Sequence, residues 1–374
     1  MAAPLRIGVI GAGWIATDHI VVLRKLGHEV VAVCDIDAAR AAEVAPEGAR
    51  SYTDAERLLA EEELDAVWVS TPPLHHRAPA VAAMEKGLPV YLEKPIARTL
   101  DDAREIVEAA ERTRAVCAIG YQWHATEALE KLREALRGQP VAYLWGVSVG
   151  PTAARPWFLD RKGGGGNLLE RGSHQLDLQR AVAGDVASVQ VAASPVYLAQ
   201  SELDEVGDIE DAATMTLRFE SGAVGTVLLA WTRQGQPGSY SLDVLAPSAT
   251  LHVKLDPAFT LTGQVGDERI KETMTVHPFE RSVSRFLEAV EAGDPSRVFC
   301  TPRDALGTLA TALACERSLL EGGRAIELSQ VLGGRRWWRR RAPGSTHSSS
   351  RLPTRCRRTR PTSPTCPPPR PTRR

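Results

Sequence analysis

The sequence predicts an α/β protein. It would have a doubly wound parallel sheet in its first third and then an α+β domain with an open, mostly antiparallel sheet. Up to about residue 120, short apolar runs alternate with segments of helical pattern, which is typical of βαβ units. Beyond that point, strand-like runs follow one another with short connections. The 374-residue length fits two domains. We place the domain limits at 1–121 and 122–330, with a separate tail at 331–374.

The elements of the first domain are expected in regular alternation. Continuous apolar runs of strand length suit a parallel sheet that is buried on both faces. We expect strands at 7–10, 30–34, 66–70, 90–92 and 116–119, and helices at 16–26, 38–44, 54–62, 78–86 and 100–112.

The second domain is predicted to open with a helix at 125–137 and a strand at 141–149. A loop rich in Gly, Trp and Arg then leads to a helix at 167–182. Turn signals such as Gln236-Pro237-Gly238 separate the strand-like runs that follow. We expect those strands near 186–198, 211–219, 223–232, 239–245, 249–254 and 258–262, and closing helices near 279–292 and 302–321.

The composition is that of an ordinary globular protein, with 43% hydrophobic and 24% charged residues. No apolar run approaches the roughly 18 residues of a membrane span, and the first residues lack a signal-peptide pattern. We therefore expect a cytoplasmic protein without a membrane partner. Residues 1–330 carry 32 of the 45 basic residues and all 46 acidic ones, a balance of −14. Such an acidic body argues against nucleic-acid binding.

The tail at 331–374 contains 13 Arg and no Asp, Glu or Lys, and Pro, Ser and Thr make up much of the rest. This composition predicts disorder, because it offers too little apolar surface to offset the entropy of ordering. Two interpretations stay open. The tail is either a basic segment for nucleic acid or acidic membranes, or a non-functional extension that arose from a reading-frame shift near Gly333.

The six cysteines are scattered and form no CxxC pair, and the sequence contains no HExxH motif. We expect reduced core cysteines and no bound metal.

A dinucleotide fingerprint opens the chain. Gly11, Gly13 and Ala16 occupy the three small positions of a GxGxxA motif that follows a strand and begins a helix. Gly11 allows the tight turn, Gly13 lets a pyrophosphate approach the backbone, and Ala16 permits close helix–strand packing. Trp14 and Ile15 would then lie at the helix N-terminus, where the phosphates bind. The pattern predicts a Rossmann domain.

The ribose end of the cofactor is predicted at Asp35, which ends the next strand 19 residues after Ala16. A carboxylate there binds both adenosine ribose hydroxyls and repels a 2′-phosphate, so NAD is favoured. Arg40 lies within reach of the same end and keeps NADP possible. Two further strands end at the same edge of the predicted sheet, which is where ligands of such sheets bind. Ser70, Thr71 and Pro72 follow one strand, and Glu93 and Lys94 follow the next.

Four motifs together resemble the glucose–fructose oxidoreductase, inositol dehydrogenase and MocA-like (Gfo/Idh/MocA) family: GAGWIA, STPPLHH, LEKP and GGGGNLLERGSHQLD. The resemblance covers about residues 5–330. It implies the two-domain fold, hydride transfer on sugars, polyols or related cyclic alcohols, and homo-oligomers, dimeric or tetrameric, that pack through the second sheet.

The resemblance also assigns residues. Lys94 matches the lysine of EKP, and His174 and Asp177 match the histidine and closing aspartate of GxHxxD. Glu170 stands where the family usually has aspartate, which lengthens the carboxylate by one methylene. His76 matches the histidine after the TP turn, and Glu93 resembles the acid near the nicotinamide ribose.

Physical chemistry points to the same residues. Hydride transfer from an alcohol needs a base for the hydroxyl proton. Histidine titrates near neutral pH and can serve in both directions, while a lysine stabilises developing negative charge. On a helix spanning 167–182, Glu170, His174 and Asp177 would share one face. We therefore expect Lys94, His174 and Glu170 to be catalytic. Candidate substrate-binding residues are Asp177, Trp157, Arg161 and Gln122.

The resulting hypothesis is an NAD(P)-dependent oxidoreductase acting on a sugar, sugar derivative or cyclic polyol. Two alternatives stay open. One is a glycoside-cleaving enzyme that uses NAD in a transient redox step. The other is a non-catalytic, dinucleotide-sensing regulator. The intact Lys94 and His174 argue against the regulator.

Overall fold

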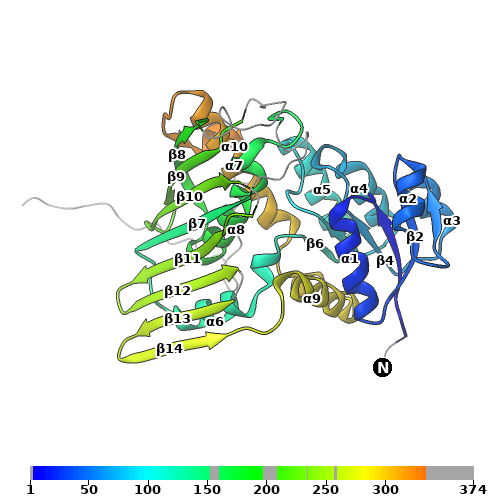
Figure 1. Ribbon diagram of the computed structural model, residues 1–374, viewed down its shortest axis with the longest axis horizontal. Helices are drawn as coiled ribbons and strands as arrows, with labels where there is room; N and C mark the ends of the chain where they lie inside the picture. Colours follow the sequence, from blue (N-terminus) through cyan, green and yellow to red (C-terminus); the bar gives the residue numbers. More distant parts are fainter. Residues whose placement is uncertain (1–2, 152–159, 197–208, 234, 257–258, 334–374) are drawn as a thin grey trace, which may run out of the picture. The chain divides into compact units, whose positions relative to one another are not determined.

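The computed structural model describes residues 3–151, 160–196, 209–233, 235–256 and 259–333. Met1–Arg339 form one compact unit, and both sheets of the protein belong to it (Figure 1). The predicted boundary after residue 121 therefore stays a prediction. The predicted tail lies outside the described residues from 334 onward. Before that point, the last helix continues to Leu332, whose side chain is buried.

The first sheet has six strands in the order β3-β2-β1-β4-β5-β6, and all of its paired strands run parallel. This is the predicted doubly wound sheet. Strand order reverses between β1 and β4, which opens a crevice at the carboxyl ends of those strands. The strands are β1 (Arg6–Ile10), β2 (Glu29–Cys34), β3 (Arg50–Tyr52), β4 (Ala66–Val69), β5 (Val90–Leu92) and β6 (Cys117–Ile119).

The helices of this half lie close to the expected ranges. Asp37 caps α2, Asp54 caps α3 and Thr99 caps α5, each accepting bonds from backbone N–H groups of the first turn. The helices are α1 (Trp14–Lys25), α2 (Ala38–Val44), α3 (Ala55–Glu61), α4 (Arg77–Glu85) and α5 (Leu100–Thr113), with a short 3₁₀ turn η1 (Pro73–His75). Strand β3 was not predicted, because only Tyr52 of its three residues is buried.

The second sheet has nine strands in the order β14-β13-β12-β11-β7-β10-β9-β8-β15. Every described pair is antiparallel except β7 with β10, which is parallel. The prediction of a mostly antiparallel sheet is confirmed. The strands are β7 (Tyr143–Pro151), β8 (Val186–Ser194), β9 (Ala212–Phe219), β10 (Val224–Thr232), β11 (Ser239–Ala246), β12 (Ala249–Asp256), β13 (Thr260–Val265), β14 (Glu268–Thr273) and β15 (Ile326–Glu327).

One face of the second sheet is covered by helices. α8 packs on β7 and β10, and α10 packs on β8, so alternate residues along these strands are buried and the others face outward. The helices are α6 (Glu127–Ala135), α7 (Gly166–Glu170), α8 (Gly172–Ala183), α9 (Pro278–Ala292), α10 (Pro302–Leu320) and α11 (Leu328–Leu332), with 3₁₀ turns η2 (Gln122–Ala125) and η5 (Pro295–Arg297). None of the described helices combines the length and apolarity that a bilayer crossing requires.

The single helix predicted at 167–182 is two helices, because the chain breaks at Arg171 between α7 and α8. The guanidinium of Arg171 donates to the carbonyls of Gly150, Pro151 and Ala230 at the ends of β7 and β10. Gly172 follows the break, and a Cβ at that position would lie 2.9 Å from a methyl carbon of Leu229 on β10. The break therefore lets the start of α8 pack closely against the sheet.

Helix α9 comes late in the chain but packs beside α1 of the first half (Figure 1). Its Phe286 contacts two stacked rings of the first sheet, Trp68 on β4 and Tyr91 on β5, with ring centroids 5.0 and 5.6 Å away. The hydroxyl groups of Tyr91 and Ser282 are hydrogen-bonded at 3.0 Å. The two halves of the sequence therefore share one core.

Candidate active site

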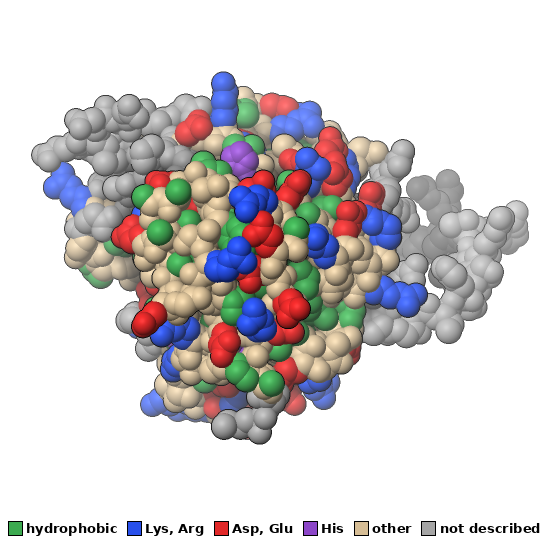
Figure 2. Space-filling view, turned by 90° about the vertical axis from the view of Figure 1, so that its right-hand side faces the viewer, with side chains coloured by type: hydrophobic (Ala, Val, Ile, Leu, Met, Phe, Trp, Pro, Cys, Tyr) green, Lys and Arg blue, Asp and Glu red, His purple; other side chains and the backbone are tan. Residues whose placement is uncertain are grey.

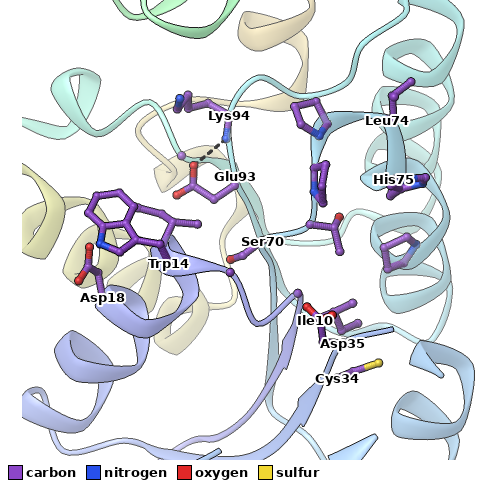
Figure 3. Close-up of a pocket in the computed structure, with 18 of the residues that line it drawn as sticks. Ile10, Trp14, Asp18, Cys34, Asp35, Ser70, Leu74, His75, Glu93 and Lys94 are labelled. Carbon is purple, nitrogen blue, oxygen red and sulfur yellow. Dashed lines mark hydrogen bonds between the residues drawn. The ribbon is translucent and has the colours of Figure 1, made fainter. Parts of the chain in front are cut away.

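A cavity of about 1220 Å³ follows the carboxyl ends of β1, β2, β4 and β5. This volume exceeds the roughly 300–1,000 Å³ of common small-molecule pockets and suits a long ligand. In Figure 3 the labelled residues run from Asp35 and Cys34 at one end, past Ser70, to Glu93 and Lys94 at the other. Most of the residues predicted to bind the cofactor line it: Gly11, Gly13, Trp14, Ile15, Asp35, Arg40, Ser70, Thr71, Pro72, Glu93 and Lys94.

The turn between β1 and α1 has the geometry that a dinucleotide requires. Gly11 has φ +96°, and a Cβ there would lie 2.6 Å from the backbone of Ser70 and Thr71. At Gly13 a Cβ would meet no described atom within 4 Å, so the backbone is open to an approaching ligand. No described side chain caps α1, which leaves its N-terminus to an anion such as a pyrophosphate.

Asp35 lies at the opposite end from Lys94. Its carboxylate accepts hydrogen bonds from the backbone N–H groups of Ala12, at 2.8 Å, and Asp37, at 3.0 Å. The Nε–H of Arg40 donates to the carbonyl of Ala12 at 2.9 Å, so this exposed guanidinium is anchored beside Asp35. If the phosphates bind at α1 and the ribose at Asp35, the nicotinamide would lie at the opposite end of the cavity, formed by Glu93, Lys94 and Gly120; we call this the nicotinamide end.

Lys94 and Glu170 meet at the nicotinamide end. The Lys94 ammonium donates to Glu170 Oε1 in an ion pair whose side chains are 14% and 12% exposed. Lys94 follows β5 and Glu170 ends α7, so residues 76 positions apart in the sequence come together here.

His174 lies next to this pair, and its ring is packed against Tyr121 and Trp123 at centroid distances of 5.8 and 5.0 Å. Among the described residues, none makes a hydrogen bond with its Nδ1. Burial, reinforced by the positive charges of Lys94 and Arg171, holds the pKa of His174 well below its ordinary value of 6.5. This low pKa favours the neutral imidazole, whereas the sequence-based expectation was a group that titrates near neutral pH.

A second cavity of about 280 Å³ adjoins the first and shares Gln122, Glu170, His174 and His277 with it. Aromatic side chains line it together with polar and charged ones, a combination found in small-molecule sites. The remaining lining residues are Trp123, Ser148, Arg171, Trp231, Tyr240, Leu255, Asp256, Phe259 and Pro278.

Asp177 does not line either described cavity. Its carboxylate accepts from Thr308 at 3.2 Å and is hydrogen-bonded to His124 Nδ1 at 2.9 Å, and its side chain is 2% exposed. His174 and Asp177 both lie on α8, but only His174 lines the cavities, because Asp177 faces His124 and Thr308 instead. Asp177, His124 and the nearby thiol of Cys300 lie close enough to hold a metal ion. The expected absence of a metal stays a prediction.

Three other predicted residues lie elsewhere. His76 is fully buried, with its Nε2 2.7 Å from the carbonyl oxygen of Thr71 and its Nδ1 3.3 Å from that of Ile96. Its neighbour His75 lines the cavity instead. Arg161 pairs with buried Glu210 at 2.8 Å rather than lining a cavity. Trp157 lies outside the described residues.

Sequence reasoning missed two groups at the nicotinamide end. His19 on α1 contacts Glu93 with its Nε2 2.8 Å from Oε1, although an apolar helix face gave no reason to single it out. His277 lines both cavities and caps α9 by accepting from the N–H of Phe279.

These features together define a nicotinamide-dependent oxidoreductase. They are a parallel sheet, a glycine turn open to a phosphate, an acid at the predicted ribose end and a Lys–Glu–His group at the other end. Residues 5–121 match the family model described as oxidoreductase family, NAD-binding Rossmann fold, and residues 131–261 match the GFO/IDH/MocA C-terminal domain. The chain belongs to the Gfo/Idh/MocA oxidoreductase family, as its motifs predicted, and binds NAD.

Known relatives extend over nearly the whole described chain. It is 30% identical to 1,5-anhydro-D-fructose reductase of Ensifer adhaerens over 86% of this chain and 98% of that one. It is 25% identical to myo-inositol 2-dehydrogenase of Thermotoga maritima over 88% and 100%. The solved structure of UDP-N-acetylglucosamine 3-dehydrogenase from Acidithiobacillus ferrooxidans matches with TM-score 0.71 and 26% identity, over 85% of this chain and all of that one.

Proposed function

We propose that this enzyme transfers a hydride between NAD and a CH–OH carbon of a sugar, sugar derivative or cyclic polyol. The observation that carries the proposal is the position of Glu170 and His174, which line both cavities at the point where these adjoin. A substrate in the smaller cavity would present its hydroxyl carbon to the nicotinamide end of the larger one. NAD supplies the hydride acceptor, and in the reverse direction NADH supplies the hydride.

The protein's own groups handle charge and protons. The neutral imidazole of His174 can accept the hydroxyl proton when an alcohol is oxidised. The ammonium of Lys94 stabilises negative charge that develops on the reacting oxygen. Glu170 fixes the direction of that ammonium through the ion pair. In these three roles, the hydride and the proton are the only charged species that are transferred.

The smaller cavity supports a carbohydrate-like substrate. The rings of Trp123 and Tyr240 pack together with their centroids 5.9 Å apart. Trp231 and Phe259 add two more aromatic rings to the lining. Aromatic faces pack well against the C–H faces of a sugar ring. Ser148 and Gln122 supply polar atoms that can bind hydroxyl groups. The relatives named as acting on anhydrofructose and inositol agree with this chemistry.

Asp35 supports NAD rather than NADP as the preferred cofactor, because its carboxylate would repel a 2′-phosphate. If the enzyme also uses NADP, the anchored Arg40 is the group that would bind its 2′-phosphate.

A cofactor-reduction screen tests the proposal. Polyols, aldoses and keto-sugars are offered with NAD and NADP separately. We expect turnover with NAD, a fall in kcat/KM of about 100-fold or more in Lys94→Ala, and a similar fall in His174→Ala. Lys86→Ala, which removes an exposed lysine at the end of α4, is the matched control. Turnover that survives both active-site changes would refute the assignment. Product without net NADH release would indicate glycoside cleavage instead.

The outward face of the second sheet supports a homo-oligomer, dimeric or tetrameric. Trp145, Leu228 and Leu245 lie on the adjacent strands β7, β10 and β11 and are 37%, 44% and 41% exposed. Exposed apolar groups on neighbouring strands favour an interface with a second copy. Analytical ultracentrifugation tests this proposal: Leu228→Asp should yield a smaller species. The cytoplasmic location stays a prediction.

A further inference from the structure

His19 and Glu93 form a buried polar pair between two elements that carry the cofactor site. His19 lies on α1, whose N-terminus faces the phosphates, and Glu93 follows β5, directly before Lys94. Nε2 of His19 and Oε1 of Glu93 are 2.8 Å apart, with the residues 0% and 6% exposed. Burying a carboxylate and an imidazole costs free energy, so a functional reason for keeping this pair is expected.

The imidazole is held rigidly. Its ring packs against Phe279 of α9 at 4.4 Å and against Tyr91 of β5 at 5.0 Å between centroids. Its Nδ1 is buried and has no hydrogen-bond partner among the described residues. Glu93 is therefore the one described acceptor or donor to which this ring is directed.

The carboxylate of Glu93 is fixed on three sides. Oε1 contacts His19, and Oε2 accepts from the backbone N–H of Lys94 at 2.9 Å (Figure 3). The third side is Gly120, where a Cβ would lie 3.0 Å from Oε1. Burial alone would raise the pKa of Glu93, but the hydrogen bond and charge of His19 and the charge of Lys94 outweigh it, and the pKa is lowered.

Glu93 shares its nearest ammonium with a second carboxylate. Lys94, whose charge lowers the pKa of Glu93, donates to Glu170, and the low pKa of His174 favours its neutral form. The other charged or titratable groups that line the same end are Asp18, which is partly exposed, and His277. Arg171 faces the smaller cavity. Two carboxylates, Glu93 and Glu170, therefore share one ammonium beside the place where the nicotinamide ring would lie.

We propose that His19 is a positioning residue that holds Glu93 as a fixed anion, so that the site binds oxidised nicotinamide more tightly than reduced nicotinamide. The inference rests on the proposed function for the location of the ring. The oxidised ring carries a positive charge and the reduced ring is neutral. A buried carboxylate distinguishes the two because its field is weakly screened. Tenfold tighter binding of the oxidised form corresponds to a potential about 30 mV lower for the bound couple.

The test measures dissociation constants for NAD⁺ and NADH separately, without any sugar, by calorimetry and NADH fluorescence. The readout is the ratio of the NADH constant to the NAD⁺ constant. We expect Glu93→Gln and His19→Leu each to lower this ratio by roughly tenfold. His19→Gln, which keeps an N–H donor, should retain most of it. The double variant His19→Leu/Glu93→Gln should show no further change, because both substitutions remove the same charge effect.

Asp18→Asn is the matched control, since it removes an acid of the same helix and cavity that is open to solvent screening. Its ratio should change by less than about twofold. An unchanged ratio in Glu93→Gln, with both affinities lowered equally, would overturn the proposal and leave the pair a structural one. If His19→Leu does not fold, the ratios measured for Glu93→Gln and His19→Gln still test the proposal. A wild type that binds both forms but turns over no sugar would refute the proposed substrate alone.

Discussion

Alanine substitution at the two glycines of the β1–α1 turn should impair different properties of the protein. At Gly11 the added Cβ would lie 2.6 Å from the carbonyl carbon of Ser70 and from the amide nitrogen of Thr71, in a left-handed conformation of φ +96°. At Gly13 the backbone is extended, with φ −69° and ψ 176°, and the Cβ would point into open space. Gly11→Ala should therefore damage folding, and Gly13→Ala should damage cofactor binding.

The magnitudes follow from this geometry. A left-handed residue other than glycine costs about 1–2 kcal/mol, and relieving a backbone clash costs about 1–3 kcal/mol, so we expect about 3 kcal/mol for Gly11→Ala. With an unfolding entropy of about 2.1 cal/mol/K per residue, this lowers Tm by roughly 4 °C for a body of this size. Gly13→Ala should leave the Tm of the cofactor-free protein within about 1 °C. It should weaken NAD binding at least about tenfold, because the pyrophosphate must approach the backbone there.

Differential scanning fluorimetry with and without NAD, together with calorimetric titration, separates the two effects. The wild-type Tm should rise with NAD concentration, as binding to the folded state requires. Equal losses of Tm in the two variants would refute the reasoning. So would a Gly13→Ala protein that binds NAD as tightly as the wild type.

Three further predictions follow from buried groups elsewhere. Arg161→Met removes the ionic partner of buried Glu210 and should cost about 3 kcal/mol in urea denaturation; a loss below about 1 kcal/mol would show that Glu210 finds another partner. Burial raises the pKa of the Cys34 thiol to about 11 and that of Cys117 to about 12, so iodoacetamide at pH 8 should label both slowly in the native protein and quickly in urea, and rapid native labelling would contradict this burial. Because burial lowers the pKa of His174 in the folded state, the unfolded chain binds more protons below about pH 6.5, and stability should fall as pH drops through that value, by up to about 1.4 kcal/mol per pH unit. His174→Gln should show a shallower fall in urea titrations at pH 7 and pH 5.5, and identical slopes would refute the assignment.

The parts of the fold that depend on local patterns could be predicted from the sequence. The βα turn at Gly11 and Gly13 and the acid at Asp35 belong to one short fingerprint. The alternation of apolar runs and helices fixed the expectation of a parallel sheet. The edge strand β14 was missed, because Glu268–Thr273 is mostly charged and exposed, as edge strands often are.

The parts of the site that depend on tertiary contacts could not be predicted. The break at Arg171 comes with bonds to strand ends 20 to 59 residues away. Asp177 is bonded to His124 and Thr308, 53 and 131 residues away, and so does not line the cavities. His19 lies on the buried side of a helix, where a histidine gives no sequence signal of function. Its role depends on a contact 74 residues away.

The parallel pairing of β7 with β10 makes one side chain responsible for two strands. Because the two strands run the same way, their last residues, Pro151 and Thr232, are paired with each other. Arg171 donates to carbonyls near both of these ends, those of Gly150, Pro151 and Ala230, and it also lines the smaller cavity. A shift of this guanidinium would therefore reach the wall of the cavity and the middle of the second sheet at the same time.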